Sequence, residues 1–221
     1  MSDELALPGA GETASGLIPG MAGAIECLLA MPRNVPRGVA VVCHPHPLHG
    51  GAMSNKVVYT LASCALKQDL AVARFNFRGV GRSQGSHDHT RGETVDCLTV
   101  VQWMRSQVPG VPLLLAGFSF GAYVALKAAS QAGAVALLSV APPFGRYLEQ
   151  TQNPPHPGCP WRILHSRDDD IVAYEDTVAA AAEYDPAPEW VVVDGAGHLF
   201  HGRLQDVQEA AMPFLRRSFA G

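Results

Sequence analysis

Two serines occupy the centre of the pattern Gly-x-Ser-x-Gly, which can present a hydroxyl for nucleophilic attack on a carbonyl. They are Ser83 and Ser119. The pattern works only between a buried strand and a helix, because the tight turn then lifts the hydroxyl above the sheet edge. Apolar residues 113–116 precede Ser119 and the helical run 122–127 follows it, whereas a polar, turn-like segment follows Ser83. Ser119 is therefore the predicted nucleophile, and Ser83 is predicted to lie in a structural turn.

A serine nucleophile needs an imidazole to accept its proton and a carboxylate to fix the tautomer of that imidazole. The apolar segment 189–193 runs into a glycine-rich turn that contains His198, ahead of the last helical stretch. His198 is the predicted general base, and His201 is its nearest rival. Upstream, the apolar segment 161–165 is followed by three adjacent aspartates at 168–170. Spacing alone does not show which of them is the carboxylate that orients His198.

A histidine-rich loop, His-Pro-His-Pro-Leu-His-Gly-Gly at 44–51, follows the apolar segment 38–43. The spacing of His44, His46 and His49 allows a metal site. However, no carboxylate or cysteine accompanies the three histidines, and the prolines hold the chain extended, which tends to point neighbouring side chains apart. We therefore expect neither a metal nor a cofactor, and we keep a metal-dependent hydrolase only as a weaker alternative.

The same loop is better suited to donate a backbone N–H to an oxyanion hole. The first donor would be the N–H of Phe120, at the positive end of the helix that follows the nucleophile. His46 is the candidate for the second donor and Leu48 is the alternative, since the two prolines of the loop carry no N–H.

The elements that must position these residues alternate along the chain. Apolar runs typical of strands lie near 24–30, 38–43, 70–76, 112–116, 134–140, 161–165 and 189–193. Segments with helical periodicity lie near 54–68, 91–106, 120–131, 174–183 and 203–219. Several strands are apolar at consecutive positions, which a strand covered on both faces requires. The pattern predicts an α/β fold with a mostly parallel, doubly wound sheet and helices on both faces.

A chain of 221 residues with 48% hydrophobic composition is long enough for one α/β domain. We expect residues 1–20 to form a loosely attached arm and residues 21–221 to form the single domain. Residues 141–160 are the only stretch that could cap the site, and they are too few to build a separate lid domain. Possible pocket walls are Leu48, Phe118, Tyr123 and Phe144.

Composition and charge narrow the possible partners. The net charge of −4 and the scattered lysines and arginines do not favour nucleic acid. No apolar stretch is long enough to span a membrane, and the N-terminus lacks the positive region of a secretory signal. Five irregularly spaced cysteines indicate small buried side chains rather than a disulfide framework. We expect a cytoplasmic protein, monomeric or homodimeric, that acts on a small molecule.

The segments His-Pro-His-Pro-Leu-His-Gly-Gly, Phe-Asn-Phe-Arg-Gly-Val-Gly and Gly-Phe-Ser-Phe-Gly-Ala-Tyr resemble the α/β-hydrolase superfamily, and within it the small, lidless, dienelactone-hydrolase-like proteins. The resemblance runs from about Gly20 to Phe219. The family's acid loop resembles Gly-x-x-Asp-x-x-Val, which selects Asp169. A serine replaces the glycine here, so Asp168 remains the second choice. Dienelactone hydrolases proper use a cysteine nucleophile, so the serine at 119 does not imply lactone activity.

The resemblance implies hydrolysis of an ester or a related acyl bond through a Ser-His-Asp triad and an acyl-enzyme intermediate. We expect a small or medium acyl substrate, because no lid domain encloses the site. Thioesters and amides remain open as alternatives to esters. The alternative from another functional class is a binding protein that keeps the scaffold without catalysis.

Overall fold

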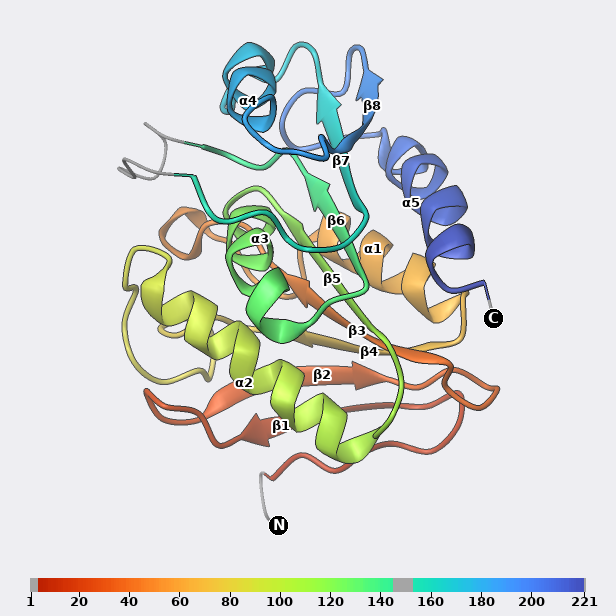
Figure 1. The fold of residues 1–221 in the computed structure, drawn as a ribbon. Coiled ribbons are helices and arrows are strands. Elements are labelled where there is room, and N and C mark those ends of the chain that lie inside the picture. Colours follow the sequence, from red (N-terminus) through yellow and green to blue (C-terminus); the bar gives the residue numbers. More distant parts are fainter. Residues whose placement is uncertain (1–3, 145–152, 221) are drawn as a thin grey trace.

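Strands that are apolar at every position form the centre of the protein. All residues of β3 (Gly38–Cys43) and β5 (Leu113–Phe118) are buried, because helices cover both faces of the sheet at these strands. Figure 1 shows this three-layer arrangement in the computed structural model, which describes residues 4–144 and 153–220. The α/β architecture is thus the one that the sequence predicts.

Eight strands form one sheet in the order β1-β2-β4-β3-β5-β6-β7-β8. The remaining strands are β1 (Thr13–Ile18), β2 (Ile25–Ala30), β4 (Leu70–Phe75), β6 (Ala136–Val140), β7 (Trp161–Ser166) and β8 (Glu189–Val193). Strands β1 and β2 pair antiparallel, as do β2 and β4, whereas all other pairs are parallel. This confirms the prediction of a mostly parallel sheet.

Helices cover both faces of this sheet. They are α1 (Lys56–Leu66), α2 (Arg91–Gln107), α3 (Phe120–Ala132), α4 (Tyr174–Ala181) and α5 (Leu204–Ser218). The buried side chains of α1 and α5 form one apolar cluster with one face of the central strands. Those of α2 and α3 form a second cluster with the other face. The predicted doubly wound arrangement is therefore confirmed.

The N-terminal segment differs from our expectation of a loosely attached arm. Residues 13–18 form β1, which pairs with β2 along its whole length, and Leu5 donates a hydrogen bond to Leu17 and is buried. For these residues the prediction is wrong. The sequence of β1 contains two small residues and a glycine and lacks a clear alternation of apolar side chains, so the pairing with β2 stabilises the strand where its own propensity does not.

The parallel strands bring the predicted site residues to one edge of the sheet. Strands β3, β5, β7 and β8 run in the same direction, so their carboxyl ends lie at the same edge. The loops that follow these four strands carry the histidine-rich segment, Ser119, the three aspartates and His198, in that order.

Candidate active site

Ser119 lies in the sharp turn between β5 and α3, with φ 53° and ψ −125°. A positive φ is strained for a residue other than glycine. The sharp turn lifts the hydroxyl above the edge of the sheet. The turn can form because Gly121 approaches the carbonyl groups of Cys43 and His44 so closely that a Cβ would overlap them. The strand, the turn and the helix therefore have the geometry that a serine nucleophile requires.

The second Gly-x-Ser-x-Gly copy has no such geometry. The Ser83 hydroxyl donates a hydrogen bond to the carbonyl of Asn76 (2.6 Å) and accepts one from the backbone N–H of Glu26 (2.9 Å). These contacts join the turn to the start of β2. Because both the proton and a lone pair of the hydroxyl are used in this way, Ser83 has a structural role, as the sequence context predicts.

His198 joins the hydroxyl of Ser119 to a carboxylate. Its Nε2 lies 3.0 Å from Oγ of Ser119, and its Nδ1 lies 2.8 Å from Oδ2 of Asp169. An ionised carboxylate only accepts hydrogen bonds, so Nδ1 donates to Asp169 and Nε2 is left to accept the serine proton. All three side chains are at least nine-tenths buried. Residues 79 positions apart thus form one hydrogen-bonded chain.

The neighbouring aspartates have different environments. Oδ1 of Asp169 accepts hydrogen bonds from the backbone N–H groups of Ile171 (2.9 Å) and Val172 (2.7 Å), which directs Oδ2 to His198. Asp168 instead accepts from the hydroxyl of Ser166 (2.7 Å) and from the N–H of Gly195 (2.7 Å). It therefore connects the loop after β7 to the loop after β8 and does not reach the imidazole of His198.

The electrostatics of Asp169 favour its ionised form. Burial raises the pKa of the carboxyl group, but the hydrogen bond and charge of His198 lower it, as do the N–H groups of Val172 and Ile171. The net pKa of Asp169 lies below its ordinary value. The carboxylate is therefore charged near neutral pH and can stabilise a positive charge on the imidazole of His198.

The loop after β3 leaves one of the two candidate N–H groups available. The backbone N–H of Leu48 donates to Nδ1 of the His46 side chain (3.2 Å), so it is already used. The ring of His46 packs against Phe120, with 4.8 Å between the ring centroids. Phe120 is the first residue of α3, where helix geometry leaves the N–H without a partner inside the helix. His46 is therefore the better candidate for the second donor.

Comparisons with known proteins identify the family to which this fold belongs. A model of the alpha/beta hydrolase fold family matches residues 48–141. A lidless α/β serine hydrolase from Xanthomonas campestris is 35% identical over 97% of each chain, with a TM-score of 0.86. An α/β serine hydrolase homologue from Coxiella burnetii is 38% identical over 94% of this chain and 99% of its own, with a TM-score of 0.84. The chain belongs to the α/β-hydrolase family. A protein of Rickettsia prowazekii is also 31% identical over 207 residues, which are 89% of this chain and 86% of that protein. Membership supports a hydrolase activity.

The histidine-rich loop of this α/β hydrolase does not gather its histidines around a common point. His44 is buried, with Nδ1 at 2.7 Å from the carbonyl of Pro45 and Nε2 accepting from the N–H of Phe77 at 3.0 Å. Both ring nitrogens are thus used. His46 and His49 stack on each other, with 4.4 Å between centroids. Across residues 4–144 and 153–220, no group of three or more His, Cys, Asp or Glu side chains is arranged to hold a metal ion.

The burial of His44 predicts a loss of stability in acid. Burial lowers the pKa of His44 from 6.5 to about 4, although its hydrogen bond to Pro45 acts in the opposite direction. Between these pH values the unfolded chain binds a proton that the folded chain does not. The contribution to stability is therefore complete above pH 6.5 and is lost as the pH falls toward 4. In urea unfolding, the free energy of unfolding should fall between pH 7 and pH 5 in both proteins, and the fall should be about 2 kcal/mol smaller in His44→Gln than in the wild type. Equal losses would contradict this role.

The predicted pocket walls divide into core and surface. The side chains of Phe118, Tyr123 and Phe144 are 0%, 1% and 4% exposed, so they form the core behind the site and not an open wall. The ring of Phe118 packs against His198, with 5.2 Å between the ring centroids, and supports the imidazole. Leu48 is 69% exposed and remains available to a ligand. Residues 145–152 of the predicted cap lie outside the described part of the chain.

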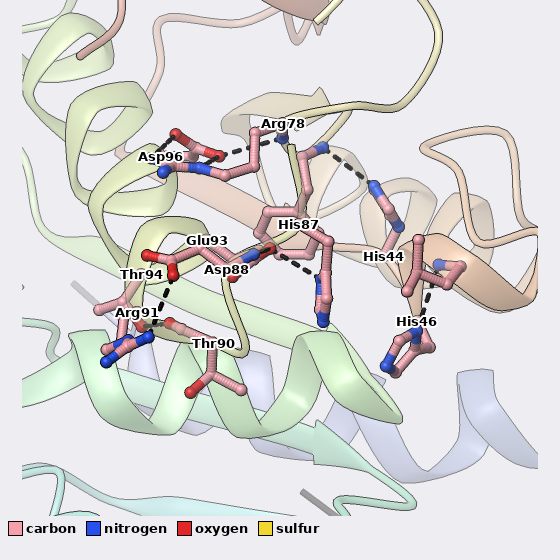
Figure 2. Close-up of polar contacts among 12 residues, drawn as sticks. His44, His46, Arg78, His87, Asp88, Thr90, Arg91, Glu93, Thr94 and Asp96 are labelled. Atoms are coloured by element: carbon pink, nitrogen blue, oxygen red, sulfur yellow. Dashed lines mark hydrogen bonds and ion pairs between the residues drawn. The ribbon is translucent and has the colours of Figure 1, made fainter. Parts of the chain in front are cut away.

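Two supporting groups were not predicted. His165, in β7, is fully buried, and its Nδ1 lies 2.9 Å from the carbonyl of Ser166 and 4.0 Å from Oδ2 of Asp169. A second carboxylate–imidazole pair, Glu93 and His87, lies beside the histidine-rich loop (Figure 2). His87 falls in a polar stretch whose composition indicates only a turn, so nothing in the sequence distinguished it.

Within the described residues, no helix is long and apolar enough to cross a membrane.

Proposed function

We propose that the protein is a serine hydrolase that cleaves an ester bond of a small or medium acyl substrate. The observation that supports this most strongly is the hydrogen-bonded chain from Ser119 through His198 to Asp169, with contacts of 3.0 and 2.8 Å. A nucleophile, a base and an orienting carboxylate in this arrangement perform acyl transfer on several unrelated folds. Thioesters and amides share this chemistry, but their leaving groups differ.

The reaction would proceed in two acyl transfers. In the first, Oγ of Ser119 bonds to the substrate carbonyl carbon while its proton moves to Nε2 of His198. The tetrahedral intermediate then expels the alcohol, which takes that proton and leaves an acyl-enzyme. In the second, water attacks the acyl carbon, gives a proton to His198 and releases the carboxylic acid as Ser119 recovers its proton. No cofactor enters either step.

The oxyanion of each intermediate would accept hydrogen bonds from the backbone N–H groups of Phe120 and His46. The positive end of the α3 dipole adds to the same stabilisation. Each such donor typically contributes about 100- to 1000-fold in rate. Because both donors belong to the backbone, side-chain substitutions at these two positions would act mainly through the shape of the turn.

An apolar acyl group is consistent with the rim of the site. Three apolar side chains stay exposed on three of the four loops that carry site residues: Leu48, Ile171 and Leu199. Ile171 is two residues from Asp169, and Leu199 follows His198 directly. Exposed apolar side chains on three loops around a catalytic centre favour an apolar ligand, because binding would remove their surface from water.

A graded panel of 4-nitrophenyl esters on the purified protein tests this proposal. We expect hydrolysis of short and medium acyl chains and loss of activity after treatment with a fluorophosphonate. Activity on thioesters or anilides at a higher kcat/KM than on esters would change the assigned leaving group. Failure of every ester, thioester and amide would contradict the proposal and favour a binding protein that keeps the scaffold.

A further inference from the structure

Both ring nitrogens of His44 are held by the backbone. His44 follows β3 directly and is 0% exposed. Its Nδ1 lies 2.7 Å from the carbonyl oxygen of Pro45, and its Nε2 lies 3.0 Å from the backbone nitrogen of Phe77, a contact that a dashed line marks in Figure 2. Because the carbonyl can only accept and the N–H of Phe77 can only donate, the ring proton is on Nδ1 and Nε2 accepts. Burial also lowers the pKa of His44 to about 4, so the ring is neutral near pH 7.

The carbonyl that His44 holds shares a peptide unit with a proposed oxyanion donor. The carbonyl of Pro45 and the N–H of His46 belong to one planar group, and in a trans peptide they point in opposite directions. This peptide is trans, since the only cis bond in the described part of the chain is Asp185–Pro186. The hydrogen bond from Nδ1 of His44 draws the carbonyl toward the ring, so it directs the N–H of His46 away from the ring.

The N–H of His46 has no partner within the fold. Across residues 4–144 and 153–220, no group accepts a hydrogen bond from it. The carbonyl of His46, in contrast, accepts from the N–H groups of His49 (3.1 Å) and Gly51 (3.0 Å). The ring of His46 packs against Phe120, the first residue after the nucleophile. The loop therefore keeps one N–H free beside the turn that carries Ser119.

Gly51 approaches the same peptide unit closely. A Cβ at this position would overlap the carbonyl oxygen of Pro45 and would lie 2.6 Å from the carbonyl oxygen of His46. Both are backbone atoms, which cannot move aside as the end of a flexible side chain can. The observed orientation of the Pro45 carbonyl therefore depends on two features of the loop, the donor on His44 and the absence of a side chain at Gly51.

We propose that His44 is a positioning residue of the oxyanion hole: its Nδ1–H holds the carbonyl of Pro45 and thereby directs the N–H of His46 at the oxyanion. Its Nε2 attaches the same loop to the segment after β4 through Phe77. This inference deepens the function proposed above and rests on it, because it concerns the second oxyanion donor of that reaction.

Two substitutions of His44 separate the roles of its two nitrogens. The side-chain amide of asparagine can place an N–H near the position of Nδ1, whereas that of glutamine can place its oxygen near the position of Nε2. His44→Gln thus loses the donor to Pro45, and His44→Asn loses the acceptor for Phe77. We expect kcat on 4-nitrophenyl acetate to fall by about 100-fold in His44→Gln and by less than about tenfold in His44→Asn. The loss in His44→Gln should be equal in kcat and kcat/KM, because the oxyanion exists only after attack.

His49→Gln is the matched control, because His49 is an exposed histidine of the same loop whose side chain makes no described hydrogen bond. Its kcat should equal that of the wild type. Each His44 variant loses one of two buried hydrogen bonds, so thermal melting should show similar decreases in stability for the two. Equal kcat values in the two His44 variants, or a larger loss in His44→Asn, would mean that the ring only supports the fold and would overturn the inference.

Gly51→Ala moves the same peptide without changing His44. The new methyl group would displace the carbonyl of Pro45, and the N–H of His46 would turn with it. We expect a loss of about tenfold or more in kcat with little change in KM. A folded Gly51→Ala protein with the kcat of the wild type would contradict the dependence of the reaction on this peptide.

Crystal structures of the His44 variants separate this inference from the proposed function. The peptide between Pro45 and His46 should be rotated in His44→Gln and should keep its wild-type orientation in His44→Asn. This readout does not depend on whether the protein hydrolyses any ester. An inactive wild type would count against the proposed function, whereas an active wild type with an unrotated peptide in His44→Gln would overturn the role of His44 alone.

Discussion

Replacement of Ser119 by alanine is expected to lower kcat on 4-nitrophenyl acetate by about a million-fold, the loss that removal of a triad serine causes in another serine hydrolase. The hydroxyl is the only group of the triad that forms a bond to the substrate, so no other residue of the chain replaces it. Alanine at a φ of 53° keeps the strain of the turn and adds no bulk. The variant should therefore fold like the wild type, and its residual rate should reflect only binding and the oxyanion donors.

Ser83→Ala is the control for this experiment, since Ser83 lies in the second copy of the same pattern. It removes the hydrogen bonds to Asn76 and Glu26, so it should lower the melting temperature. The kcat of the folded protein should stay close to that of the wild type. A large loss of kcat in Ser83→Ala, with Ser119→Ala still active, would reverse the two assignments.

Replacement of Asp169 by asparagine is expected to lower kcat by about 10,000-fold, the effect of the equivalent change in chymotrypsin-type enzymes. An amide N–H facing Nδ1 of His198 would leave the proton on Nε2. That nitrogen lies 3.0 Å from the hydroxyl of Ser119 and could no longer accept its proton. The measurement is the single-turnover rate with an activated ester, compared with the binding of the same ester to Ser119→Ala.

Asp168→Asn serves as the matched control for Asp169→Asn. The amide oxygen of asparagine can still accept hydrogen bonds from Ser166 and Gly195, so the loops after β7 and β8 stay connected. We expect a loss of less than about tenfold, with a small decrease in stability. If Asp168→Asn were instead the more damaging of the two, the triad acid would have to be Asp168.

The sequence predicted the parts of the fold that depend on local pattern. The apolar runs of β3 and β5, the change to helical period after Ser119 and the glycines around it all follow from short-range requirements, so they could be placed from the residues alone. That Ser119, the aspartates and His198 lie at one edge of the sheet then follows from parallel strands that end there.

What the sequence did not predict depends on contacts between distant residues. Strand β1 forms because it pairs with β2, although its own residues have weak strand propensity. Phe118 and Tyr123 are close to Ser119 in sequence, yet alternation along β5 and the helical turn of α3 direct both side chains into the core. The prediction that these aromatic residues line a pocket rested on their closeness to Ser119 in sequence, and it selected residues of the core.

The pair of Glu93 and His87 was missed for the same reason. The two residues are six positions apart, and only the left-handed turn at 89–90 brings the imidazole back onto the carboxylate. Neither residue type is unusual in a polar loop. The choice between Asp168 and Asp169 was also open from spacing, and it depends on which carboxylate receives the backbone N–H groups of 171 and 172.

The central claim is that the hydroxyl of Ser119 is activated by His198 to form a covalent bond with an acyl or phosphonyl group. The most direct test is to treat the folded protein with a fluorophosphonate and to locate the added mass by peptide mass spectrometry. We predict a single modified residue, Ser119, and no modification when His198 is replaced by alanine. An adduct on another residue, or an unmodified protein after labelling under conditions that modify a known serine hydrolase, would contradict the claim.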